Sequence, residues 1–234
     1  MNILDLFFPK RCVNCKKVGD YICPDCFSRL SFDTEDICPE CSRPAISGIT
    51  HPKCKKKYSL EGTFTAVVFN KTAKKLLYQF KYRPYLTDLK VTLTDLMHES
   101  LIQNEEFERV YSGQGNRLLI VPVPLYKAKQ RMRGYNQAEI LGREMAGKLG
   151  LPMTNALLRM RDTRSQVGLD KTERRENLRE AFGLKDGLNE EIRDKSVFLI
   201  DDVLTTGATL SEAGKALRRA GAEKVWGIAL AKEK

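Results

Sequence analysis

All seven cysteines of the chain lie before residue 55, and six of them form Cys-x-x-Cys pairs. The unpaired Cys54 follows His51 at the same spacing, so these two residues make a fourth two-ligand unit. Zinc binds four sulfur or nitrogen ligands, and a two-residue spacer lets both ends of a turn reach one ion. The eight ligands therefore predict two structural zinc ions: Cys12, Cys15, Cys23, Cys26, Cys38, Cys41, His51 and Cys54.

Other uses of these cysteines fit less well. An odd cysteine count without a secretion signal argues against a disulfide framework, and a redox pair would be single and lie in a βαβ unit. Catalytic zinc would need an open ligand position, which two complete sets do not leave. Two pairings stay open: a sequential one, and an interleaved one that joins the first pair to the third. We expect a scaffold, because sixty residues bury too small a core without metal.

The length of 234 residues exceeds one average domain of about 150 residues. We expect a cysteine-rich zinc-binding domain over 1–60 and a larger domain over 61–234. The net charge of +10 suits polyanionic ligands, and two histidines leave little room for histidine-dependent catalysis. Since no apolar stretch reaches the 18 or so residues of a membrane span, we expect a protein that is neither secreted nor membrane-spanning.

From residue 61 onward, short apolar runs typical of buried strands alternate with helical patterns. This order predicts an α/β fold, with a mostly parallel sheet flanked by helices. The expected strands cover 63–69, 118–121, 197–200 and 225–230. The expected helices cover 72–80, 86–103, 136–149, 172–181 and 210–220.

Two adjacent carboxylates, Asp201 and Asp202, follow the strand expected at 197–200, and a Thr-Thr-Gly turn then leads into a helix. Ligands of open α/β sheets bind beyond the carboxyl ends of the strands. Carboxylates there can accept hydrogen bonds from a sugar diol, and a helix N-terminus with hydroxyl donors suits a phosphate. Gly207 lets the backbone close around the anion. A metal site and a solvated strand end are the alternatives.

Residues 142–149 have the spacing of a Walker A motif, but Leu149 replaces the Ser or Thr that would hold magnesium. The segment also lies inside a helical pattern instead of following a strand. We therefore interpret it as part of a helix, and we expect no nucleotide hydrolysis by this chain.

Residues 197–210, VFLIDDVLTTGATL, resemble the phosphoribosyl pyrophosphate (PRPP) motif of type I phosphoribosyltransferases. Together with the cysteine pairs, 121–125 (VPVPL) and 131–137 (RMRGYNQ), this motif makes the chain resemble the competence protein F family over nearly its whole length. That family joins an N-terminal zinc-binding segment to a phosphoribosyltransferase-like domain and is associated with DNA uptake during natural transformation. One departure is Pro84-Tyr85, where relatives commonly carry Gly-Asp.

The resemblance implies roles for individual residues. Asp201 and Asp202 would contact the ribose hydroxyls. The turn at Val123 and Pro124 would meet pyrophosphate, with Mg²⁺ bridging oxygens of the ligand. The residues that would cradle the 5-phosphate are Thr205, Thr206, Gly207, Ala208 and Thr209. The residues that would belong to a mobile flap or to the family motif are Arg131, Arg133, Gly134, Asn136, Gln137, Arg161, Thr163 and Gln166.

Two functions follow from this resemblance. In the first, the chain is a DNA-uptake protein that binds single-stranded DNA and PRPP, with a DNA-translocating ATPase as a partner. Basic and aromatic side chains interleave as single-strand binding requires, at Lys81, Tyr82, Arg83, Lys127 and Lys129. In the second, the chain is a phosphoribosyltransferase that acts on a nitrogen acceptor. We expect a cytoplasmic protein that reaches the inner face of the membrane through its partners.

Overall fold

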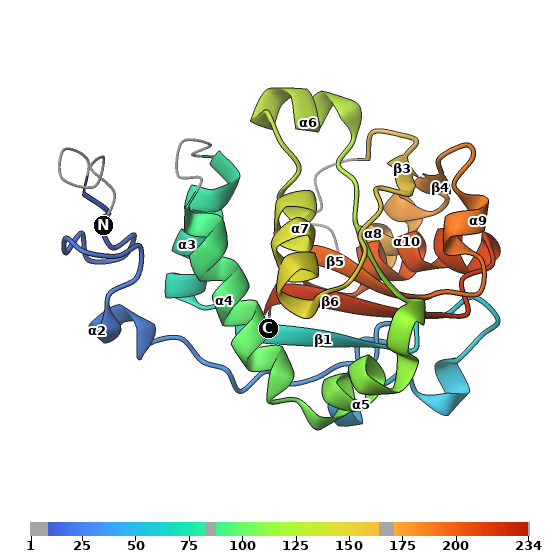
Figure 1. Ribbon diagram of the computed structural model, residues 1–234, viewed down its shortest axis with the longest axis horizontal. Coiled ribbons are helices and arrows are strands. Elements are labelled where there is room, and N and C mark those ends of the chain that lie inside the picture. The colour runs from blue at the N-terminus through green and yellow to red at the C-terminus, as the bar shows by residue number, and fades with distance from the viewer. Residues whose placement is uncertain (1–8, 83–87, 164–170, 234) are drawn as a thin grey trace.

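The structure of residues 9–82, 88–163 and 171–233, a computed structural model, confirms the predicted α/β fold (Figure 1). Four strands form a sheet in the order β1-β6-β5-β2, and every pair in it is parallel. The elements in chain order are α2 (Pro24–Phe27), η1 (Ile46–Gly48), η2 (Pro52–Cys54), β1 (Gly62–Val68), α3 (Lys71–Tyr82), α4 (Leu89–Ile102), α5 (Glu105–Gln114), η3 (Gly115–Arg117), β2 (Leu118–Pro122), α6 (Lys127–Arg133), α7 (Gln137–Leu149), β3 (Leu157–Arg159), α8 (Lys171–Leu178), β4 (Phe182–Leu184), α9 (Asn189–Ile192), β5 (Ser196–Leu204), α10 (Ala208–Arg219) and β6 (Lys224–Lys232).

Helices cover both faces of the sheet, as the continuous apolar runs of its strands require. Side chains of α3, α4, α5 and α7 pack on one face, and those of α10 pack on the other. On the first face, Phe107 lies between Phe64 and Phe198, with ring centroids 5.4 and 5.3 Å away. Phe64 also stacks on Trp226 at 5.2 Å, so one aromatic cluster joins α5 to three strands.

The cysteine-rich segment packs against the larger part of the chain at several places. Ile49 forms a β-bridge with Gly62, and the Val68 amide donates to the carbonyl of Ser31 at 2.8 Å. Cys12 and Tyr21 are buried in the same hydrophobic cluster as the first face of the sheet. The boundary between residues 60 and 61 stays a prediction.

The four predicted strands and the five predicted helices are all present. The main difference is at β5, which continues through Asp201 and Asp202 to Leu204 instead of ending at residue 200. The reason is β6, which is also longer than expected and pairs Ala231 with Val203. The helix expected over 172–181 ends at Leu178, since Glu180 has a φ of 55° and β4 follows.

From residue 61 onward, three α-helices of the described ranges, α5, α6 and α9, lie outside the helical ranges expected from the sequence. The antiparallel pair of β3 and β4 was also missed, because three-residue strands carry almost no periodicity. Within the three described ranges, no helix is long and apolar enough to cross a membrane.

The aromatic cluster gives a stability prediction. Phe107 is 0% exposed whereas Phe27 is 39% exposed. Phe107→Ala should lower the free energy of unfolding by about 3–5 kcal/mol, because it removes a buried ring and leaves a cavity. Phe27→Ala should cost much less. Urea titrations of both variants measure the difference, and equal losses would contradict this assignment of the core.

Candidate functional site

A cavity of about 490 Å³ lies at the carboxyl edge of the sheet. It brings together residues that are far apart in the sequence, from the ends of α3, β2, α6, β3 and β5 and the starts of α7 and α10. Its lining includes Lys81, Tyr82, Val123, Pro124, Leu125, Lys129, Met132, Arg133, Asn136, Gln137, Ala138, Arg159, Asp201, Asp202, Val203, Thr205 and Thr209. Both predicted carboxylates and the predicted turn after β2 therefore border one space.

The carboxylates form the acidic side of this cavity. Asp202 Oδ2 lies 2.8 Å from Nζ of Lys81, and the Asp202 amide donates to Asp201 Oδ1 at 2.8 Å. Burial, followed by repulsion from Asp202, raises the pKa of Asp201 to about 7. Burial lowers the pKa of Lys81, but attraction to Asp202 and Asp201 outweighs it, so the net shift is upward. The carboxyl pair thus holds a cationic side chain beside it.

The predicted anion loop, residues 205–209, leads from β5 into α10. Gly207 has a φ of 78° and precedes the first residue of the helix. The loop therefore ends at a helix N-terminus, where backbone N–H groups and the helix dipole favour a negative charge. Thr205 and Thr209 line the cavity, so the loop faces the same space as the carboxylates.

Several buried donors around the cavity have no hydrogen-bond partner among the described residues. They are Nε of Arg133, Nε2 of Gln137 and Nε of Arg159, and the hydroxyl of Thr206 in the anion loop is also unpaired. Buried polar groups are rarely left unsatisfied in native proteins. Donors without acceptors, around a cavity that also offers two carboxylates, suit a ligand with anionic oxygens and hydroxyl groups.

Asn136, which also lines the cavity, fixes the turn after β2. Its Nδ2 donates to the carbonyl of Val123 at 3.0 Å, and its Oδ1 accepts from the amide of Ala138 at 3.2 Å, which caps α7. The Val123 amide donates to the carbonyl of Ile200 at 2.9 Å. The turn after β2 is therefore held both to α7 and to β5.

Three of the predicted nucleic-acid residues, Lys81, Tyr82 and Lys129, line this cavity. Lys81 pairs with Asp202 inside the cavity, and Lys129 lies at its rim, 3.2 Å from the carbonyl of Thr163. Lys127 is exposed on α6, outside the lining. Tyr82 lines the cavity and is 51% exposed. Arg83 lies outside the described residues.

The predicted flap and motif residues are also divided. Arg131 and Arg161 are exposed and do not line the cavity, whereas Thr163 is buried and accepts a hydrogen bond from Arg159. Gln166 lies outside the described residues. Gly134 lines a second cavity, of about 420 Å³, between α3, α4, α6 and α7.

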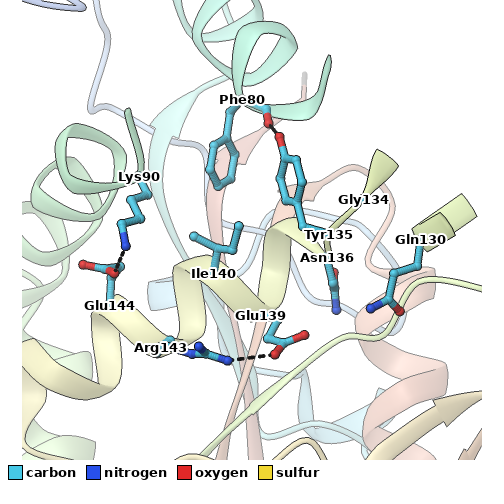
Figure 2. Close-up of a pocket in the computed structure, with 10 residues that line it drawn as sticks. All are labelled: Phe80, Lys90, Gln130, Gly134, Tyr135, Asn136, Glu139, Ile140, Arg143 and Glu144. Carbon is cyan, nitrogen blue, oxygen red and sulfur yellow. Dashed lines mark hydrogen bonds and ion pairs between the residues drawn. The ribbon is translucent and has the colours of Figure 1, made fainter. Parts of the chain in front are cut away.

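Figure 2 shows this second cavity, in which the Tyr135 hydroxyl donates to the carbonyl of Phe80. Two ion pairs, Lys90–Glu144 at 2.8 Å and Arg143–Glu139 at 2.9 Å, lie along another wall. The charged groups drawn there are paired with one another, so this cavity offers weaker binding chemistry than the first one.

Arg159 is a site residue that the sequence analysis missed. It ends β3, lies over the ring of Phe182 at 5.4 Å and reaches the cavity from there. Burial lowers the pKa of this guanidinium, while the charges of Asp201 and Asp162 raise it. An arginine in the apolar run 157–160 was the available signal, but the sequence does not show that β3 lies beside the sheet edge.

Two exposed tyrosines form a small aromatic surface beside the first cavity. Tyr78 and Tyr82 are 57% and 51% exposed, and their ring centroids lie 4.8 Å apart on α3. The guanidinium of Arg133 lies over the Tyr82 ring at 5.3 Å from its centroid. Since Tyr82 and Arg133 also line the cavity, we call Tyr78, Tyr82 and Arg133 the stacking surface.

The metal ligands form two clusters, and the pairing is the sequential one. The first cluster is Cys12, Cys15, Cys23 and Cys26, and the second is Cys38, Cys41, His51 and Cys54. In each, the ligand atoms all lie within 4.8 Å of one another, as four ligands around one zinc ion require. Nε2 of His51 lies 3.0 Å from the carbonyl of Pro44, which leaves Nδ1 to face the metal, 3.3 Å from Cys41 Sγ. Both clusters fit structural zinc.

Two family models match the chain. A double zinc ribbon domain matches residues 3–56, and a phosphoribosyl transferase domain matches residues 136–234. These matches cover both clusters and the part of the chain that holds the anion loop.

Curated relatives extend over both regions. Competence protein ComFC of Bacillus subtilis is 29% identical over 212 residues, which are 88% of this chain and 81% of that protein. DNA utilization protein YhgH of Escherichia coli K12 is 27% identical over 207 residues, 87% of each chain. Competence protein F of Haemophilus influenzae is 45% identical over 115 residues; that match spans 48% of this chain and 50% of the relative's length.

The clusters predict the metal content. Protein purified under reducing conditions should hold about two zinc ions per chain, one for each four-ligand cluster. Cys15→Ser and Cys54→Ser should each remove one, because they affect different clusters. Mass spectrometry of the metal content measures this. Folded wild-type protein with a content near zero would refute the zinc assignment.

The raised pKa of Asp201 predicts an unusual pH dependence of stability. A carboxyl whose pKa is higher in the folded state, about 7 against an ordinary 3.8, stabilises the fold at low pH and loses this contribution as the pH rises through 7. Asp201→Asn should therefore melt at least about 3 °C above wild type at pH 8.5, and this excess should shrink to roughly half at pH 5.5. Thermal melts of Asp201→Asn and of the exposed control Asp186→Asn test this. A constant difference across this pH range would contradict it.

Proposed function

Because the chain belongs to the competence protein F family, with a zinc-binding N-terminal segment and a phosphoribosyltransferase-like domain, we propose that it binds single-stranded DNA and PRPP during DNA uptake. The names of the relatives, two competence proteins and a DNA utilization protein, support the role in DNA uptake. The observation that carries the ligand proposal is the set of unpaired buried donors around a cavity with two carboxylates.

PRPP matches this set of groups. Its ribose diol supplies hydroxyl donors for Asp201 and Asp202, and its 5-phosphate suits the loop at the N-terminus of α10. Its pyrophosphate supplies acceptor oxygens for the guanidinium groups of Arg133 and Arg159. Arginine binds phosphate oxygens through paired hydrogen bonds. Mg²⁺ bound together with PRPP would reduce the negative charge of the pyrophosphate. Lys81 forms an ion pair with Asp202.

The DNA proposal rests on the stacking surface and on charge. Single-strand binders combine basic grooves with exposed aromatic rings, on which bases stack. Tyr78 and Tyr82 provide such rings, and the net charge of +10 attracts the phosphate backbone. Because Tyr82 and Arg133 also line the cavity, DNA on the stacking surface would lie beside bound PRPP.

A motor for DNA transport would be another protein. The Walker-like residues 142–149 lie inside α7, which leaves no strand-to-helix loop there to cradle a nucleotide. We therefore place a DNA-translocating ATPase among the partners of this chain.

Phosphoribosyl transfer is the second candidate function. The groups proposed to hold PRPP, with Asp201 and Asp202 on the diol, border one cavity and would also position its ribose for this transfer. The proton of the acceptor nitrogen would pass to water. In that reaction the acceptor nitrogen bonds to C1 of the ribose, the bond from C1 to pyrophosphate breaks, and the cationic donors stabilise the departing pyrophosphate. Release of pyrophosphate from PRPP on addition of a nitrogen base would favour this candidate.

The carboxylates provide the test of PRPP binding. Replacing Asp201 and Asp202 together with Asn should abolish PRPP binding measured by calorimetry with Mg²⁺, because Asn lacks the charge that orients the diol and the metal-bound ligand. Asp186→Asn, an exposed change outside the cavity, should bind like wild type. Unchanged affinity in the double variant, with its near-ultraviolet circular dichroism preserved, would remove the ribose assignment.

The stacking surface gives a separate test of DNA binding. Tyr82→Ala should weaken the binding of a fluorescent oligothymidylate by roughly tenfold, since one stacked base contributes about 1–3 kcal/mol. Tyr58→Ala is the control: Tyr58 also lies beneath a lysine and an arginine side chain, but on the cysteine-rich segment. Fluorescence anisotropy measures both affinities. Equal affinities would show that DNA does not stack on Tyr82.

A further inference from the structure

One turn of the second zinc cluster touches the anion loop directly. The turn comprises residues 38–42, from Cys38 to Ser42, and we call it the knuckle turn. The hydroxyl of Ser42 donates to the carbonyl of Thr206 at 2.8 Å. Beside it, a Cβ atom on Gly207 would lie 2.9 Å from the carbonyl oxygen of Pro39, closer than a side chain tolerates. The loop and the knuckle turn are therefore in backbone contact.

The same turn also contacts the helices on either side of the loop. A carboxylate oxygen of Glu40 accepts from the hydroxyl of Ser211, in the first turn of α10, at 2.9 Å. Arg175 of α8 donates to the carbonyls of Pro39, at 3.3 Å, and of Glu40. The knuckle turn thus joins the start of α10, the anion loop and α8.

A zinc ion in the second cluster would fix the shape of this turn, because two of its five residues are ligands of that cluster. Within the turn, the Ser42 amide donates to the Cys38 carbonyl at 2.7 Å, and Ser42 has a left-handed φ of 56°. Cys38 and Pro39 are buried, whereas Glu40, Cys41 and Ser42 are only partly buried, so packing alone holds only the first part of this turn. An ion shared by Cys38 and Cys41 would fix Pro39 and Glu40 between them.

We propose that the zinc ion of the second cluster positions the anion loop, so that zinc binding there and phosphate binding by residues 205–209 stabilise each other. The phosphate half of this proposal rests on the proposed function. Coupling between two sites is reciprocal, so PRPP should slow the loss of this ion to a chelator. The first cluster contacts α3 instead, through the 2.8 Å hydrogen bond from Lys75 to Asn14. Its ion should therefore not position the loop.

Hydrogen exchange in the full-length chain tests the positioning. Cys54→Ser removes a ligand of the second cluster without altering the knuckle turn itself. It should raise the exchange rate of the amides of 205–211 by tenfold or more. Cys15→Ser, the matched change in the first cluster, should leave these amides at the wild-type rate. Equal rates in Cys54→Ser and wild type, with one zinc ion confirmed as lost, would overturn the proposal.

A milder pair of variants tests the coupling to the ligand. Ser42→Ala removes one hydrogen bond and should weaken PRPP binding about threefold to tenfold, the usual range for one hydrogen bond. Ser28→Ala removes a similar hydroxyl-to-carbonyl bond, to Asp25, beside the first cluster and should have no effect. Equal affinities in Ser42→Ala and wild type would overturn the coupling. If wild type binds no PRPP, the proposed function fails, and the exchange rates alone decide whether zinc positions the loop.

Discussion

Two adjacent carboxylates in a buried strand are the constraint on which the site depends. Asp201 and Asp202 lie just past the last residue that β5 pairs with β2, where β5 pairs with β6 alone. They are partly buried there, so their charges need cations from elsewhere in the chain. Lys81 comes from α3, Arg133 from α6 and Arg159 from β3. The parallel sheet makes this possible, because loops that follow its strands meet at one edge. Placing the two carboxylates here raises the pKa of Asp201, and buried donors around them have no hydrogen-bond partner among the described residues. Both features are common at ligand-binding sites.

The strands of the sheet and the helices that flank it can be predicted from the sequence, because their apolar periodicity is local. The acidic residues and the anion loop can be predicted because they form one continuous motif. The sequence does not place Lys81, which interleaves with aromatic residues like a DNA-binding lysine but pairs with Asp202, about 120 positions away. Arg159 was missed for the same reason, since β3 reaches the cavity only through long-range packing. The pairing of the zinc ligands also depends on the folded path of the chain, as spacing alone fits both arrangements.

The cysteine-rich segment contacts elements that line the cavity of the larger domain. Its first cluster is tied through Lys75 to α3, which carries Lys81 and the two tyrosines of the stacking surface. Its second cluster is tied to the anion loop through Ser42. The two metal-ligand clusters thus contact the two elements that would hold DNA and phosphate. This arrangement gives a physical reason for joining a zinc ribbon to a phosphoribosyltransferase-like domain.

The central claim is that one edge of the sheet serves both DNA and PRPP, and the binding of single-stranded DNA with and without PRPP and Mg²⁺ tests it most directly. Anisotropy of a fluorescent oligonucleotide across a salt series should show tight binding at low salt that weakens linearly with the logarithm of salt concentration. PRPP should shift that affinity at every salt concentration, because its charges would lie beside Tyr82 and Arg133. An absence of binding at low salt, or an affinity that PRPP leaves unchanged, would contradict the account.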